Sequence, residues 1–300
     1  MDNIFNKEFW IDQWENDKKN DTCNVHRGFS TPEYWNNAAA TYNKGKKEVK
    51  ARRLEKTVSA LKEQNLLFDR MKVLEIGCGT GLLAMELAKH GAQITALDFS
   101  AKMLERFKKD ITPDIENNIT ILHEDWHKID IEEKQWEKKF DLVIAFMSPG
   151  VASPESFFKM MNCSKKGCAM QGWAAKRAHP ILSDLWEIIN QTPLEDKPQS
   201  ILYKINLLFS LNYFPEISFS TIEWQHTSTV GQECNKQIEF FKKVSSKSRD
   251  ELEKIIRPYL QSIAKGNTIS RRHKGLTAMA IWKIDSKMGQ NSSKLLVSQK

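Results

Sequence analysis

The stretch VLEIGCGTG, residues 73–81, decides how this chain folds. A short β-rich run, residues 72–76, leads directly into a turn with three glycines, and residues 82–90 then favour a helix. Glycines in such a turn allow positive φ and let a ligand approach the backbone, while the start of the next helix offers free N–H groups. The stretch therefore predicts a strand, a ligand-binding loop and a helix in succession.

Strands and helices keep alternating beyond this unit. Further strands are predicted at 93–97, 119–122, 140–146 and 168–173, with helices at 82–90, 101–109 and 155–161. The run FDLVIAF at 140–146 is apolar throughout, which is typical of a strand covered on both faces of a parallel sheet. The pattern predicts an α/β fold with a doubly wound, mostly parallel sheet and helices on both of its faces.

The segments around this core are more helical. Thr31 and Pro32 predict a helix start, with the helix running through Tyr42. Residues 46–65 predict an amphipathic helix whose many lysines and arginines we interpret as a solvated face. After the core, the sequence predicts two helices within 180–214, with a polar break at 192–199, and then a strand at 217–223. Further helices are predicted within 231–264, split near 245–248, and a last strand at 276–284.

Composition excludes several classes of protein. The 300 residues are 40% hydrophobic and 28% charged, as in an ordinary globular protein, and the net charge of +7 is too small to demand a nucleic-acid partner. No run of about 18 apolar residues predicts a membrane span, and MDNIFNKEFW does not resemble a secretory signal. The five cysteines are scattered and complete no zinc set, so we expect reduced thiols, no bound metal and a cytoplasmic location.

The glycine spacing separates the ligands that such a loop can hold, which are dinucleotides and S-adenosylmethionine (SAM). A dinucleotide loop needs G-x-G-x-x-G, but Leu82 stands where its last glycine would be, and the pattern of a nucleoside-triphosphate loop is also absent. Asp98 ends the second predicted strand about twenty residues after the loop, where an acid accepts hydrogen bonds from both ribose hydroxyls. The loop and this acid together favour a nucleoside ligand.

These residues resemble the class I SAM-dependent methyltransferase family. EIGCGTG at 75–81 is similar to its first motif, LDFSAKM at 97–103 to its second, and Glu124-Asp125-Trp126 to its third. The resemblance is close over residues 70–175. It implies a Rossmann-like seven-stranded sheet with an antiparallel last strand and a helical lid. It also implies transfer of a methyl group from SAM, with S-adenosylhomocysteine as the product.

The resemblance implies a division of the chain. N-terminal lid helices would occupy residues 1–45, and a SAM-binding domain would occupy 46–285, with its core at 70–175 and helical insertions at 180–214 and 231–264. Residues 286–300 would form a polar tail. The residues that it implies for cofactor binding are Glu75, Gly77, Cys78, Gly79, Gly81, Asp98, Phe99, Met103, Asp125 and Trp126.

The sequence predicts the methyl acceptor less specifically than the cofactor. We expect a small molecule, with an aromatic and apolar site formed by Tyr34, Tyr42, Met147, Trp173 and Trp224. The loop after the fourth strand, MSPGV at 147–151, holds neither an acid nor a histidine, so the catalytic residues stay unassigned. Candidate bases elsewhere are His26, His123, Glu223 and His226. A nucleic-acid methyltransferase of the same fold and a non-catalytic SAM-binding regulatory module stay open as alternatives, and the oligomeric state is not predicted.

Overall fold

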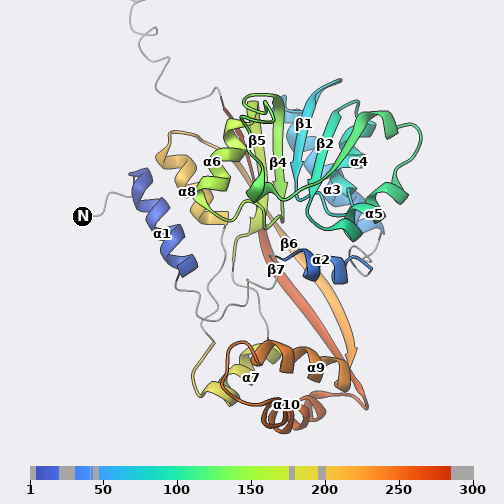
Figure 1. Cartoon of the computed structure of the whole chain (residues 1–300), viewed down its shortest axis with the longest axis vertical. Helices are drawn as coiled ribbons and strands as arrows, with labels where there is room; N and C mark the ends of the chain where they lie inside the picture. The colour runs from blue at the N-terminus through green and yellow to red at the C-terminus, as the bar shows by residue number, and fades with distance from the viewer. Residues whose placement is uncertain are drawn as a thin grey trace, which may run out of the picture.

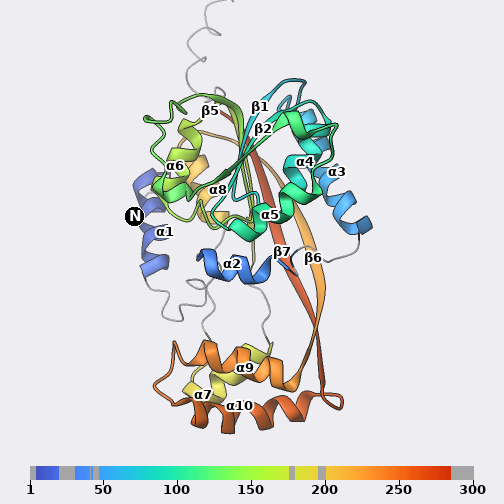
Figure 2. The same cartoon turned by 45° about the vertical axis from the view of Figure 1, so that its right-hand side comes forward.

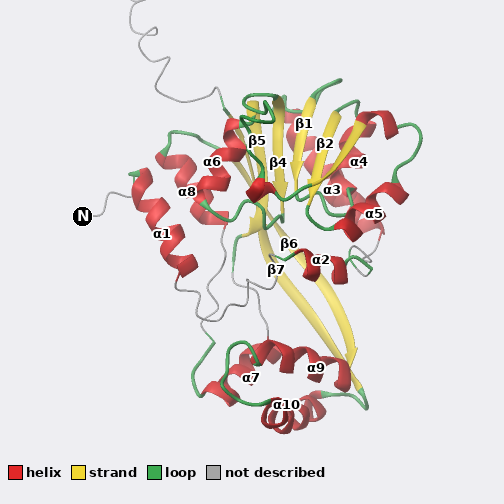
Figure 3. Ribbon diagram, viewed as in Figure 1, coloured by secondary structure: helices red, strands yellow, loops and turns green. Residues whose placement is uncertain are grey.

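The computed structural model describes residues 5–19, 31–40, 42, 47–175, 180–194 and 201–284. A seven-stranded sheet in the order β3-β2-β1-β4-β5-β7-β6 forms its centre (Figure 1 and Figure 3). The strands are β1 (Lys72–Ile76), β2 (Gln93–Asp98), β3 (Ile119–His123), β4 (Phe140–Phe146), β5 (Ser164–Trp173), β6 (Glu216–Thr229) and β7 (Thr268–Lys283). Strands β1 to β5 pair in parallel, and β7 is antiparallel to both of its neighbours. The predicted fold class is confirmed.

Helices cover both faces of the sheet, as the apolar strands require. The helices α3 (Lys47–Glu63), α4 (Leu82–Lys89) and α5 (Ala101–Asp110) pack on one face, where Leu61, Leu87 and Phe107 are fully buried. The helices α1 (Lys7–Lys19), α6 (Pro154–Asn162) and α8 (Ile201–Ser210) pack on the other face, around Phe157 and Trp282. Two apolar cores therefore hold the sheet between two helical layers.

The strand order reverses at β1, which lies between β2 and β4. The connection after β1 leaves toward one side of the sheet and the connection after β4 toward the other, so a crevice opens where these loops part. Ligands of open α/β sheets bind in this crevice, beyond the carboxyl ends of the strands. The fold thus places the glycine loop at the position where a ligand site is expected.

Strands β6 and β7 extend far beyond the rest of the sheet as a two-stranded ribbon (Figure 2). Both predicted strands were too short, because the outer part of the ribbon, residues 224–229 and 268–275, consists mostly of polar residues and lacks an apolar alternation. Arg271, Arg272 and His273, which precede the strand predicted at 276–284, lie inside β7. Trp224 likewise lies within β6, opposite His273, and does not follow the strand as predicted.

A bundle of three helices sits at the far end of this ribbon. It consists of α7 (Pro180–Asn190), α9 (Val230–Phe241) and α10 (Arg249–Ile263), which share a core around Leu185, Phe241 and Ile256. A buried ion pair between Glu233 of α9 and Arg271 of β7 ties the bundle to the ribbon. The bundle therefore has a core of its own, separate from the two cores of the sheet.

The short helix α2 (Pro32–Ala38) precedes α3 in the chain. Thr31 caps it by accepting from the Tyr34 amide, and Pro32 occupies its first turn, as predicted. The helix ends at Ala38 rather than at Tyr42. His26 and the predicted tail at 286–300 lie outside the described residues.

Three further findings concern the described residues only. No helix among them is long and apolar enough to cross a membrane. No group of three or more His, Cys, Asp or Glu side chains among them is arranged to hold a metal ion. The four cysteines that the structure describes, Cys78, Cys163, Cys168 and Cys234, are buried free thiols.

Candidate cofactor and acceptor site

The glycine loop joins β1 to α4 with three residues of positive φ. These values are +71° at Gly77, +56° at Gly79 and +70° at Gly81, a region that side chains other than glycine rarely adopt. The amides of Gly77 and Cys78 both donate to the Leu97 carbonyl, at 2.8 and 3.0 Å, and so fix the loop to the end of β2. The loop is therefore rigidly placed beside Asp98.

Two of these glycines also allow close approach. A Cβ on Gly77 would lie 2.2 Å from Ser148 Oγ, so this glycine lets the loops after β1 and β4 come together. A Cβ on Gly81 would lie 2.1 Å from the Phe107 ring, so Gly81 serves the packing of α4 against α5. Gly77 lines the cavity described below and Gly81 does not.

Asp98 is held in the site by backbone donors. Its side chain is only 6% exposed, and it accepts from the amides of Gly79 at 2.9 Å and Ser100 at 2.8 Å. Burial nevertheless raises the pKa of Asp98, and these hydrogen bonds oppose the rise. The carboxylate is thus fixed in orientation but poorly solvated, which suits it to accept hydrogen bonds from a ligand.

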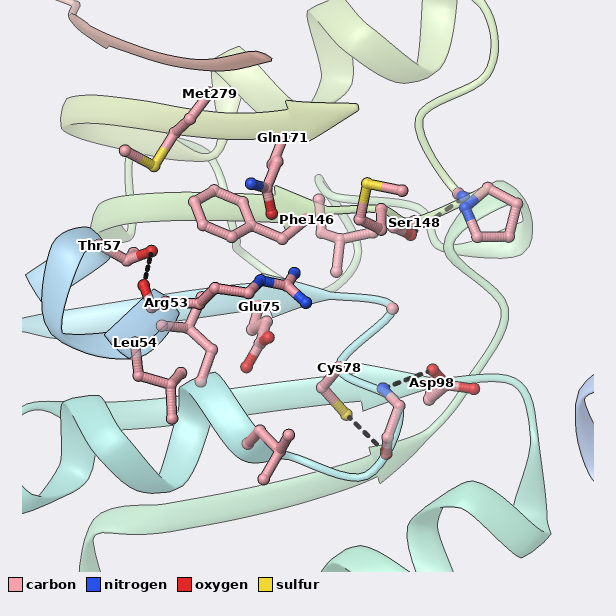
Figure 4. A pocket seen from close by; sticks show the side chains of 18 of the residues that line it. Arg53, Leu54, Thr57, Glu75, Cys78, Asp98, Phe146, Ser148, Gln171 and Met279 are labelled. Atoms are coloured by element: carbon pink, nitrogen blue, oxygen red, sulfur yellow. Dashed lines mark hydrogen bonds between the residues drawn. The ribbon is translucent and has the colours of Figure 1, made fainter. Parts of the chain in front are cut away.

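Glu75 is a second buried acid in the same site (Figure 4). It is 5% exposed, and its Oε2 is buried without a hydrogen-bond partner among the residues that the structure describes. Burial, followed by the negative charge of Asp98, raises the pKa of Glu75 to about 8. A buried carboxyl oxygen left without a donor is costly, so this atom is suited to a donor brought by a ligand.

The raised pKa of Glu75 predicts a specific pH dependence of stability. Between its unfolded value of 4.5 and about 8, the folded protein binds more protons at this side chain than the unfolded chain does. Protonation of Glu75 therefore contributes its full share to the stability of the folded protein below pH 4.5, and this contribution is lost as the pH rises through 8. We expect Glu75→Gln to be relatively more stable at about pH 8 than at about pH 5, in denaturant titrations of both proteins. An equal difference at the two pH values would contradict the assignment.

A cavity of about 640 Å³ follows the carboxyl ends of the strands. Its volume is in the range of small-molecule sites. It begins at Asp98 on β2, passes Glu75 on β1 and Phe146 on β4, and continues to Gln171 on β5 and Met279 on β7 (Figure 4). Helix α3 forms the opposite wall. One continuous space thus joins the glycine loop to the far half of the sheet.

The end of the cavity near β2 is built from predicted residues. Phe99, Met103, Asp125 and Trp126 all line it. Trp126 is 2% exposed and is fixed by Lys159 of α6, whose Nζ donates to the Trp126 carbonyl at 2.6 Å and lies 4.8 Å from the ring centroid. This end therefore combines apolar side chains with the carboxylates of Asp98 and Asp125.

Helix α3 supplies the residues that the sequence did not predict. Arg53, Leu54 and Thr57 line the cavity from this helix, and Figure 4 shows the Arg53 side chain pointing into it. Within the described part of the chain, no hydrogen bond or ion pair occupies the Arg53 guanidinium. The basic helix was interpreted as a solvated face, but Arg53 belongs to the wall of the site. Further unpredicted lining residues include Trp35, Phe146, Ser148, Gln171 and Met279.

The residues predicted for the acceptor come together only in part. Tyr42 and Met147 line the cavity, and Met147 has a φ of +53° that is unusual for a side chain of its size. Tyr34 and Trp173 do not line the cavity: Tyr34 is 40% exposed, and the ring of Trp173 covers Gly275. Only the backbone of Trp224 is described, so its predicted role is untested.

The candidate bases do not meet at the cavity. His123 is exposed with its Nε2 3.1 Å from the Phe99 carbonyl oxygen, and Glu223 is exposed on β6 near Lys274. Neither of these two residues lines the cavity. The side chain of His226 lies outside the described atoms.

A family model described as a methyltransferase domain matches residues 73–167. This range runs from β1 into β5 and contains the glycine loop, Asp98 and Asp125. Residues 73–167 thus carry a methyltransferase domain of the class I SAM-dependent type. The buried acids fit the cofactor of this family, because Glu75 Oε2 lacks a donor and Asp98 is fixed at the end of β2. The predicted cofactor is thereby confirmed.

The curated methyltransferases that match this chain are only distantly related to it in sequence. The ubiquinone biosynthesis O-methyltransferase of Rickettsia akari is 26% identical over 187 residues, which cover 50% of this chain and 72% of that protein. The malonyl-[acyl-carrier protein] O-methyltransferase of Priestia megaterium is 34% identical over 113 residues, covering 37% and 38%. The second alignment thus spans less than half of the relative. Among solved structures, magnesium protoporphyrin IX methyltransferase from Synechocystis with bound SAH has 13% identity and a TM-score of 0.46, covering 87% of this chain and 99% of that one.

Proposed function

We propose that this methyltransferase transfers the methyl group of SAM to an oxygen atom of a small molecule. The observation that carries the proposal is the continuous cavity, which extends past the glycine loop to Gln171 and Met279. This extension leaves room for an acceptor next to the cofactor. The two curated relatives described above are both named O-methyltransferases, which supports oxygen as the accepting atom.

The cofactor half of the cavity offers one group for each part of SAM. Asp98 accepts from the ribose hydroxyls, while Phe99, Met103 and Trp126 hold the adenine ring and Asp125 accepts from its amino group. The orphaned Glu75 oxygen accepts from the ammonium group of the methionine part. Arg53, whose side chain lies in the same cavity, binds the carboxylate of the same part. Opposite charges on the protein thus match the two charges of the amino-acid end.

The chemistry needs alignment more than acid or base strength. Bound SAM supplies a methyl group on a sulfonium sulfur, which a nucleophile displaces in line. The protein must hold the acceptor oxygen close to that carbon and keep water out. Gln171 is the polar side chain at the start of the acceptor half, between Phe146 and Met279. It orients the acceptor by hydrogen bonding, and its apolar neighbours exclude water.

Arg53 provides a test of the cofactor assignment. We expect Arg53→Met to weaken SAM binding about 10-fold or more, because a charged hydrogen bond contributes about 1.5–3 kcal/mol. The matched control is Arg52→Met, since Arg52 is exposed on the same helix and does not line the cavity. Binding is measured by calorimetry with SAM and with 5′-methylthioadenosine, which lacks the amino-acid end. Equal losses for both ligands would contradict the role given to Arg53.

Turnover separates the proposal from the alternatives. The protein is incubated with SAM and a panel of phenols, carboxylic acids and RNA, and S-adenosylhomocysteine is measured. Product with a small oxygen acceptor supports the proposal, and product only with RNA identifies a nucleic-acid methyltransferase. Tight SAM binding with no product from any acceptor favours the non-catalytic module.

A further inference from the structure

The segment containing α2 covers the cofactor half of the cavity. Trp35 and Tyr42 line the cavity, and their ring centroids lie 5.7 Å apart at an interplanar angle of 86°. A Cβ on Gly79 would lie 3.7 Å from Tyr42 Cε1, so the tyrosine ring stands directly over the glycine loop. A molecule bound at this loop must pass these two aromatic side chains to leave on their side.

Apolar packing does not explain how α2 is held in place. The helix has only seven residues, and none of them is fully buried. So short a helix is not stable by itself in water. Its position in Figure 2, next to α5, must therefore depend on contacts made with that helix.

Asn36 makes the first polar contact between α2 and α5. Its Oδ1 accepts from Ser100 Oγ at 2.8 Å and from the Lys102 amide at 3.2 Å. Ser100 is also the N-cap of α5, and its amide donates to Asp98 Oδ1 at 2.8 Å. One buried serine thus connects the helix over the cavity with the acid that we assign to the ribose.

Arg106 makes the second contact, at the other end of α2. Its Nη1 donates to the carbonyls of Ala39 and Tyr42, the latter at 2.9 Å. Carbonyls at and beyond the end of a helix have no partner within the helix, and a cation there also interacts favourably with the helix dipole. Because the Tyr42 carbonyl is one of the acceptors, Arg106 fixes the residue whose ring covers Gly79.

We propose that Asn36 and Arg106 are positioning residues that hold α2 closed over bound SAM. The inference rests on the proposed cofactor site. Both side chains act through α2, since neither lines the cavity itself. Release of SAM then requires these hydrogen bonds to break, whereas capture occurs with α2 already displaced. Weakening either contact accelerates dissociation more than it changes association.

The experiment measures association and dissociation rates of SAM by stopped-flow fluorescence. Asn36→Ala and Arg106→Met are each expected to raise the dissociation rate about 5- to 10-fold, the loss of one or two hydrogen bonds, with association changed less than 2-fold. Arg106→Lys keeps a donor for one carbonyl and should recover part of the loss. The control, Gln93→Ala, removes a 2.7 Å side-chain hydrogen bond to Asn118 outside the cavity and should leave both rates unchanged.

Hydrogen exchange of residues 32–42 provides the second measurement. Faster exchange in this segment alone, with unchanged thermal stability, distinguishes an opened α2 from a poorly folded variant. Wild-type dissociation rates in both variants, despite faster exchange in this segment, would overturn the proposal. Failure of the wild-type protein to bind SAM would instead overturn the proposed function.

Discussion

Asp98→Ala is expected to weaken SAM binding about 100-fold or more, because the two hydrogen bonds lost from the ribose hydroxyls go to a charged acceptor. The unliganded protein should not lose stability to the same degree. Burial raises the pKa of Asp98, which means that the folded protein holds this charge at a cost. The Gly79 and Ser100 amides lose their acceptor in the variant, which offsets this gain, so the free energy of unfolding should change by less than the free energy of binding.

Calorimetry with SAM and denaturant titration without it check the two parts of this prediction. Asp141→Ala is a suitable control, since Asp141 accepts from the Lys72 amide at 3.0 Å on β1, away from the cavity. It should lose stability and keep its affinity for SAM. Unchanged affinity in Asp98→Ala would remove this acid from the cofactor site.

Gly77→Ala is expected to abolish measurable SAM binding. The alanine would have to adopt a φ of +71°, which costs about 1–2 kcal/mol, and its Cβ would lie 2.8 Å from Ser148 Cβ and 2.2 Å from Ser148 Oγ. The loops after β1 and β4 must then separate. Both line the cavity, so the cofactor loses its fit on two sides at once.

A second substitution tests whether the contact with Ser148 is the cause. In Gly77→Ala/Ser148→Gly the nearest remaining atom is the Ser148 Cα, at 3.6 Å, so binding should return in part. The single variant Ser148→Gly shows what removal of the hydroxyl alone does. If the double variant binds no better than Gly77→Ala, backbone strain rather than this contact dominates.

Most of the residues predicted for the cofactor line one end of the cavity for a physical reason. The glycine loop, Asp98 and Asp125 each stand at or just after the end of a short β-rich run, and such runs can be recognised in the sequence. The carboxyl ends of parallel strands meet at one edge, so residues far apart in the chain converge there. The positions of most residues at this end of the cavity therefore follow from local sequence patterns.

The other half depends on packing that no local pattern records. In the sequence Arg53 cannot be distinguished from the other cations of its helix, and only the packing of α3 on the sheet turns it into the cavity. The outer part of β6 and β7 consists mostly of polar residues and shows no apolar alternation, so its length could not be predicted. Gly81 fits the loop motif yet serves helix packing, since its distinguishing neighbour, Phe107, is 26 residues away.

The order of strands at the β6 edge has a consequence for biosynthesis. Strand β7 is the last strand in the chain but lies between β5 and β6. Until the ribosome has released residues 268–283, β5 presents an open edge and β6 has no partner in the sheet. Open edges recruit strands from other chains, so the nascent protein is most prone to aggregate, and most in need of a chaperone, just before its synthesis passes this strand.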